Sequence, residues 1–277
     1  MSYYRLLGLD CEPFSTSPDP AFFYLSQVHA AALFRLRTVV ELKRGLSLVV
    51  GDIGTGKTTL ARRLSQIFYE DPRIDFHVIL NPLHGNDQEF LRNLLSAFHI
   101  DFDAARGSVD CLQAIEQYLF RKGVEQKKTV VLLIDEAQQL SHSALEVLRL
   151  LLNYETNEHK LLQLMLVGQR ELIPKVREAA NLWDRVCLKV MISPLGESGM
   201  RAMIDYRLKQ AHFEGSEALF AASALRMIYK KTGGFPRKVT LLCHDALEYL
   251  IMNGERQVDE DIVRRVSATA EKFLAVV

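Results

Sequence analysis

The segment Gly51–Thr58 most constrains the fold, because it reads G-x-x-x-x-G-K-T, the pattern of a phosphate-binding loop. The apolar, branched run Leu46–Val50 precedes it and is typical of a buried strand. Thr59–Phe68 follows, with apolar residues at helical spacing. A strand, a loop and a helix in this order distinguish such a loop from a glycine-rich turn without a ligand. The sequence therefore predicts an α/β nucleotide-binding domain.

The residue types of this loop explain its chemistry. Glycines let the backbone curl until its N–H groups face phosphate oxygens, and the following helix adds its positive N-terminal dipole. Lys57 is expected to reach the β- and γ-phosphates, and the Thr58 hydroxyl to bind Mg²⁺. We predict ATP or ADP and Mg²⁺ as cofactors. The residues expected to bind the nucleotide are Gly51, Asp52, Ile53, Gly54, Thr55, Gly56, Lys57, Thr58 and Thr59.

A second motif supplies the acids that hydrolysis needs. The apolar run Thr129–Ile134 ends in Asp135 and Glu136, as expected for a buried parallel strand whose carboxyl end faces a ligand. Asp135 would hold Mg²⁺, directly or through water, and Glu136 would act as the general base on the attacking water. Two acids can also simply begin a solvated turn, but their pairing with the phosphate-binding loop favours a Mg²⁺-dependent ATPase that converts ATP and water to ADP and phosphate.

Alternating strands and helices predict a parallel sheet with helices on both faces, from residue 29 to 194. Pro194–Gly196 marks a break, and only helical patterns follow, so we predict a helical lid domain over 195–277. Residues 1–28 are rich in aromatics and proline and are interpreted as an arm packed on the core. The expected strands are Leu46–Val50, Phe76–Leu80, Thr129–Ile134, Leu161–Val167 and Val186–Ile192. The expected helices are His29–Arg44, Thr59–Phe68, Asp87–Phe98, Cys111–Lys122, Ser141–Leu152, Glu197–Gln210, Glu217–Lys231, Pro236–Met252 and Glu260–Phe273.

Composition narrows the choice of partners. The 34 Lys and Arg residues balance the 34 Asp and Glu residues, which gives no global electrostatic case for binding nucleic acid or an anionic membrane. The four cysteines are widely spaced and are interpreted as free thiols in a reducing compartment. Because the N-terminus lacks a signal-peptide pattern and no apolar run approaches the ~20 residues of a membrane span, we expect a cytoplasmic protein.

Together these motifs resemble the AAA+ ATPases, and the finer pattern resembles the general secretion pathway protein A (GspA, ExeA) type, including MshM-like pilus-biogenesis ATPases. The resemblance covers nearly the whole chain, and its most specific parts are the opening arm and the G-x-P-R segment. Its residues lie in Tyr3–Leu9, Pro13–Phe14, Ser17–Pro20, Phe22–Ser26, His29, Leu166–Leu172, Asp184–Val186 and Gly233–Val239.

The resemblance implies roles for three further residues. Gln169 corresponds to the polar sensor that orients the attacking water, although it could instead cap a strand. Arg237 corresponds to the lid arginine that contacts the γ-phosphate. Arg185 lies where related proteins carry an arginine finger that acts on a neighbouring subunit, and an arginine can neutralise charge on the transferred phosphoryl group. A surface ion pair is the alternative for Arg185, and Arg170 and Arg177 are nearby candidates.

The implied function is ATP-driven assistance to the assembly of a bacterial secretion or type IV (MSHA-like) pilus apparatus. It implies a nucleotide-dependent oligomer, a protein partner in that assembly and possible peripheral attachment to the inner membrane through this partner, without direct insertion. The family usually continues into a membrane span, whereas this chain stops soon after the lid. It is either a soluble relative or part of a longer protein. A DNA-associated switch resembling transposition regulators is the alternative, which the balanced charge disfavours, and a small-molecule kinase is a weaker one.

Overall fold

The computed structural model describes residues 2–16, 19–101, 107–215 and 218–275. Its internal contacts divide the chain into an α/β unit, residues 28–53 and 57–192, and a helical unit, residues 1–27, 54–56 and 193–277. The boundary between the two units therefore lies within two residues of the predicted one at 194. The segment Ser17–Pro20, part of the predicted family signature, falls partly outside the described residues.

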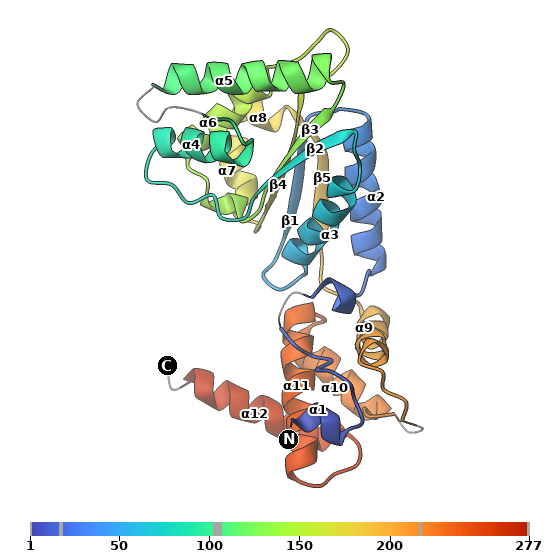
Figure 1. The fold of residues 1–277 in the computed structure, drawn as a ribbon. Helices are drawn as coiled ribbons and strands as arrows, with labels where there is room; N and C mark the ends of the chain where they lie inside the picture. The colour runs from blue at the N-terminus through green and yellow to red at the C-terminus, as the bar shows by residue number, and fades with distance from the viewer. Residues whose placement is uncertain (1, 17–18, 102–106, 216–217, 276–277) are drawn as a thin grey trace. The chain divides into compact units, whose positions relative to one another are not determined.

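The α/β unit is built on a five-stranded parallel sheet with the order β2-β3-β4-β1-β5. Figure 1 shows the strands side by side. β4 lies between β3 and β1, so the strands that precede the acids and the phosphate-binding loop are separated by one strand. The strands are β1 (Leu46–Gly51), β2 (Ile74–Ile79), β3 (Thr129–Ile134), β4 (Leu162–Gly168) and β5 (Val186–Ile192).

Helices cover both faces of this sheet, as predicted (Figure 1). On one face, alternate residues of the central strands pack against α4 (Asp87–Ala97), α5 (Ser108–Phe120) and α6 (His142–Leu151) and against two short helices, α7 (Leu172–Glu178) and α8 (Ala180–Trp183). The opposite face packs against α2 (Gln27–Glu41) and α3 (Lys57–Tyr69). The central strands β1, β3 and β4 are buried almost throughout, which explains their continuous apolar sequences.

The edge strand β2 carries polar side chains that meet α5. The Tyr118 hydroxyl donates to Asp75 Oδ2 at 2.7 Å and lies 2.8 Å from His77 Nε2. Lys122 Nζ lies 3.0 Å from the same Asp75 oxygen, and His77 Nδ1 donates to the carbonyl of Ala97 at 2.8 Å. Because His77 is buried, each of these polar groups needs its partner.

The helical unit consists of α9 (Glu197–Gln210), α10 (Ala222–Thr232), α11 (Pro236–Met252) and α12 (Glu260–Ala275), with a separate hydrophobic core. Its helices follow the predicted bounds closely. The exception is α10, which starts later than predicted, and the predicted start at Glu217 lies outside the described residues.

The N-terminal arm contains the short helices α1 (Tyr3–Leu6) and η1 (Pro20–Phe22). From the sequence we expected this arm to pack on the α/β core, but the structure groups it with the helical unit. Phe14 is buried in the helical core. The partly buried Arg207 of α9 donates to the carbonyl oxygens of Pro13, Ser15 and Phe22. The aromatic residues of the arm did predict burial, but their partner comes from a helix almost two hundred residues later in the chain.

Candidate nucleotide-binding site

The phosphate-binding loop follows β1 and leads directly into α3, whose first residue is Lys57. Gly54 and Gly56 have φ values of 81° and 97°, a left-handed region that glycine adopts without strain. Successive N–H groups in such a turn form a concave anion-binding site, and the N-terminus of α3 adds to it. These conformations explain the glycines of the motif and fit a bound phosphate.

Lys57 lies beside acidic groups of the same edge of the sheet. Its Nζ donates to the carbonyl oxygen of Asp52 at 3.0 Å. Burial lowers the pKa of Lys57, and the nearby carboxylates of Glu136 and Asp135 oppose this shift. The structure therefore brings together the loop lysine and the acid pair, which are far apart in sequence.

Asp135 and Thr58 form an oxygen-rich pair at the end of β3. The Asp135 side chain is 2% exposed, and burial raises its pKa while hydrogen bonds from the Glu136 backbone N–H and the Thr58 side chain lower it. A hydroxyl and a carboxylate are hard oxygen ligands of the kind that Mg²⁺ accepts together with water molecules. The donor set fits the predicted metal.

Glu136 has an unusual backbone conformation. Its φ of 51° and ψ of 34° are left-handed, which costs a residue with a side chain roughly 1–2 kcal/mol. Its carboxylate Oε2 accepts a hydrogen bond from Gln138 Nε2 at 2.5 Å. Strained residues of this kind gather at functional sites.

The segment after β4 contacts both motifs. The backbone N–H of Gln169 donates to Gln138 Oε1 at 3.0 Å. Arg170 forms a two-point ion pair with Asp52 of the phosphate-binding loop, with Nε 2.7 Å from Oδ1 and one terminal nitrogen 2.8 Å from Oδ2. Gln169 thus lies at the predicted edge of the sheet, between the loop and the acids.

Arg185 lies away from these motifs, whereas Arg237 contacts the phosphate-binding loop. Arg185 immediately precedes β5, so it is at the edge of the parallel sheet opposite to the ends of β1 and β3. Its buried Nη1 atom has no hydrogen-bond partner within the described part of the chain. Arg237 is the second residue of α11, and its backbone N–H donates to the carbonyl oxygen of Gly54 at 3.3 Å. Its predicted γ-phosphate contact remains a prediction.

Sequence reasoning missed Gln138 and the Arg170–Asp52 pair. Gln138 has one sequence signal, a polar residue two positions after the acid pair. The pairing of Arg170 with Asp52 depends on the position of β4 beside β1, which no local pattern reveals.

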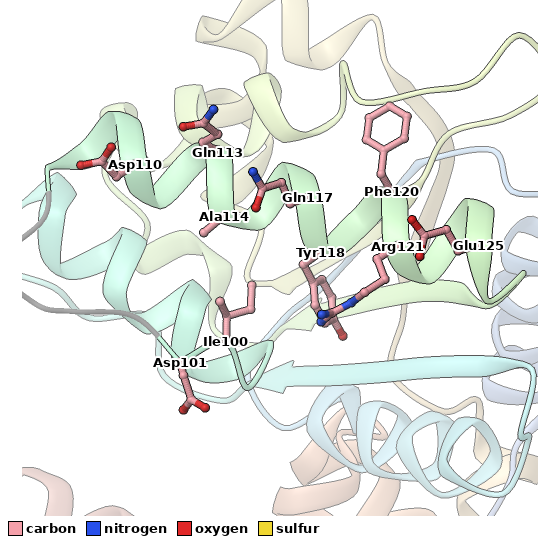
Figure 2. A pocket seen from close by; sticks show the side chains of 10 residues that line it. All are labelled: Ile100, Asp101, Asp110, Gln113, Ala114, Gln117, Tyr118, Phe120, Arg121 and Glu125. Carbon is pink, nitrogen blue, oxygen red and sulfur yellow. The ribbon is translucent and has the colours of Figure 1, made fainter.

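A second concave region, of about 630 Å³, lies along α5 (Figure 2). None of the residues that line it belongs to the phosphate-binding loop or to the acid pair, so it is separate from the predicted site. The lining residues are Ile100, Asp101, Asp110, Gln113, Ala114, Gln117, Tyr118, Phe120, Arg121 and Glu125.

The amino-acid sequence is similar to those of known proteins. Residues 40–176 match the AAA domain family. The chain is 34% identical over 258 residues to "General secretion pathway protein A" of Aeromonas hydrophila, covering 92% of this chain and 46% of that protein. It is 26% identical over 151 residues to the "Uncharacterized HTH-type transcriptional regulator MJ0774" of Methanocaldococcus jannaschii, covering 53% of this chain and 37% of that one. The chain thus spans less than half the length of these relatives.

Solved structures show the same fold. Cdc6p from Pyrobaculum aerophilum superposes with a TM-score of 0.67 at 18% identity, covering 93% of this chain and 70% of that one. The RuvB Holliday junction branch migration motor of Thermotoga maritima gives 0.57 at 18% identity, covering 88% and 69%. No helix in the described ranges has both the length and the apolar composition needed to span a membrane.

Proposed function

Because residues 40–176 belong to the AAA domain family and the chain has the P-loop AAA+ fold, we propose that it binds ATP with Mg²⁺ and hydrolyses it to ADP and phosphate. The observation that carries this proposal is the hydrogen bond between Thr58 and Asp135, with Lys57 and Glu136 beside it. It joins the two halves of the site that hydrolysis needs.

Each residue has a defined task in this proposal. The backbone of Gly51–Thr59 and the Lys57 ammonium bind the phosphates, and Thr58 and Asp135 hold Mg²⁺, which neutralises phosphate charge when bound. Glu136 takes the proton of the attacking water, and the Gln169 amide orients that water. Phosphoryl transfer needs correctly positioned reactants and stabilisation of the charge on the phosphates, and these residues would supply both.

Two variants test the activity. Glu136→Gln keeps the shape of the side chain but removes the base, so we expect ATP binding to persist while phosphate release falls at least about a hundredfold. Lys57→Ala should instead weaken ATP binding. Unchanged turnover in Glu136→Gln would contradict the proposal, and a phosphorylated small product in place of free phosphate would indicate a kinase.

We further propose that the active form is a nucleotide-dependent oligomer in which Arg185 acts on the site of a neighbouring subunit. Its place at the edge of the sheet opposite to its own site supports this role, because a strand of seven residues spans ~23 Å. Mixing tests it: Glu136→Gln and Arg185→Ala subunits, each inactive alone, should recover activity together if sites are shared. No recovery on mixing, or full activity of Arg185→Ala alone, would exclude it.

The similarity to general secretion pathway protein A supports a biological role in the assembly of a secretion or pilus apparatus, with a protein partner that brings this ATPase to the inner membrane. Deletion of the gene should then abolish secretion or piliation. Wild type should restore it and Glu136→Gln should not. Normal secretion and piliation after deletion would exclude this role.

A further inference from the structure

The side chain of Gln138 joins two segments at the carboxyl edge of the sheet. Its Nε2 donates to Glu136 Oε2 at 2.5 Å, and its Oε1 accepts from the backbone N–H of Gln169 at 3.0 Å. A glutamine amide has one donor end and one acceptor end, and here each end is assigned to a different partner. Gln138 therefore connects the proposed general base with the end of β4.

The surroundings fix this amide in place. A Cβ at Gly168 would lie 2.7 Å from Gln138 Oε1 and 3.0 Å from Leu172 Cδ2, so the last residue of β4 must be glycine for the amide to fit as it does. Lys175 Nζ donates to the backbone carbonyl oxygen of Gln138 at 2.5 Å. The backbone and the side chain of Gln138 are thus both held.

The carboxylate at one end of this link needs support. Glu136 has a left-handed backbone, and such a conformation persists only when neighbouring groups enforce it. The hydrogen bond from Gln138 occupies one carboxylate oxygen and sets the direction in which the carboxylate points. A general base must be aimed at its water within hydrogen-bonding distance.

The other end of the link leads to the phosphate-binding loop. Gln169 is followed by Arg170, whose two contacts with Asp52 fix the end of β4 to that loop. The orientation of Glu136 is therefore tied to the segment that binds phosphate through Gln138 and then through the adjacent residues Gln169 and Arg170.

We propose that Gln138 is a positioning residue for hydrolysis, which aims the Glu136 carboxylate by holding it against the end of β4. This inference rests on the proposed ATPase activity. Gln138 acts through Glu136 and makes no contact with substrate in this assignment. Its loss should reduce turnover without reducing nucleotide affinity.

Two substitutions separate the two ends of the link. Gln138→Leu removes both hydrogen bonds, whereas Gln138→Glu keeps an acceptor for the Gln169 N–H but loses the donor to Glu136. We expect both to lower kcat about tenfold, with the Kd for ADP within about twofold of wild type. Hydrogen exchange of the Gln169 amide should accelerate in Gln138→Leu and stay slow in Gln138→Glu.

The neighbouring Gln139, which is exposed, supplies the matched control, since Gln139→Leu should change neither turnover nor exchange. In the Glu136→Gln background, Gln138→Leu should cause no additional loss of turnover. An equal loss in that background, a parallel loss of ADP affinity, or unchanged Gln169 exchange would overturn the proposal. If the wild type binds ADP but does not hydrolyse ATP, the proposed function is refuted. The exchange rate of the Gln169 amide would still show whether Gln138 holds the end of β4.

Discussion

The buried network between β2 and α5 gives a quantitative prediction for Tyr118→Phe. The change deletes only the hydroxyl, which donates to Asp75 at 2.7 Å and lies 2.8 Å from His77 Nε2. Burial and the adjacent Asp75 raise the pKa of Tyr118, so the hydroxyl keeps its proton at neutral pH. Phenylalanine retains the ring and its contacts but leaves two polar groups, the Asp75 carboxylate and the buried His77 Nε2, without this hydroxyl.

The size of the effect follows from what each partner retains. Asp75 keeps its ion pair with Lys122 at 3.0 Å, whereas the ring of His77, 4% exposed, cannot replace the lost hydroxyl with bulk water. Leaving a buried polar group unsatisfied costs about 1–3 kcal/mol, so we expect the free energy of unfolding to fall by about 2 kcal/mol. With a urea m-value of about 2 kcal/mol/M, the midpoint should fall by about 1 M.

The single tryptophan of the chain makes the measurement direct, because Trp183 lies in the α/β unit and packs against its core. Its fluorescence in urea reports the unfolding of that unit. Tyr69→Phe is the control, since Tyr69 is 64% exposed and should lose less than about 0.5 kcal/mol. Equal midpoints for Tyr118→Phe and Tyr69→Phe would refute the reasoning.

Three further predictions follow from the α/β unit. Burial lowers the pKa of His77 below its ordinary 6.5, so the unfolded chain binds a proton that the folded chain does not. The free energy of unfolding should therefore be fully maintained above pH 6.5 and fall as the pH drops below it, less so in His77→Asn, as urea titrations at several pH values would show. Thr58→Val removes a proposed metal ligand and should weaken nucleotide binding roughly tenfold with Mg²⁺ but not with chelator, measured with fluorescent ADP. Leu132→Ala, at a fully buried residue of β3, should cost about 3 kcal/mol, whereas Leu42→Ala, at a residue 55% exposed, should cost under about 0.5 kcal/mol, both followed by Trp183 fluorescence.

The sheet could be predicted from the sequence because its central strands are buried on both faces. Runs such as Leu46–Val50 and Thr129–Ile134 have no polar side to show, and a short continuous apolar run is what such a strand requires. The edge strand β2, Ile74–Ile79, mixes Asp75 and His77 with apolar residues, and the predicted strand, Phe76–Leu80, began two residues too late. The motifs at the strand ends then predicted where the nucleotide site lies.

The arm shows what such patterns omit. Aromatic residues such as Phe14 indicate burial but not the surface that buries them. That surface belongs to the helical unit, where Phe14 joins the apolar core and the Arg207 guanidinium donates to carbonyl oxygens of the arm. No local sequence pattern distinguishes Arg207 from an arginine that lies on the surface. The assignment of the arm to the helical unit therefore could not be predicted from the sequence.

The link through Gln138 depends on two facts that are not local. The left-handed backbone of Glu136 turns the chain so that a residue two positions later can reach the carboxylate, and no residue type in Glu136–Gln139 requires that turn. The sheet order places β4 between β3 and β1, although β4 is later than both in the sequence. Because of this insertion, the segment after β4 is the one that can contact the acids through Gln138 and the phosphate-binding loop through Arg170, and substitutions there should affect both motifs.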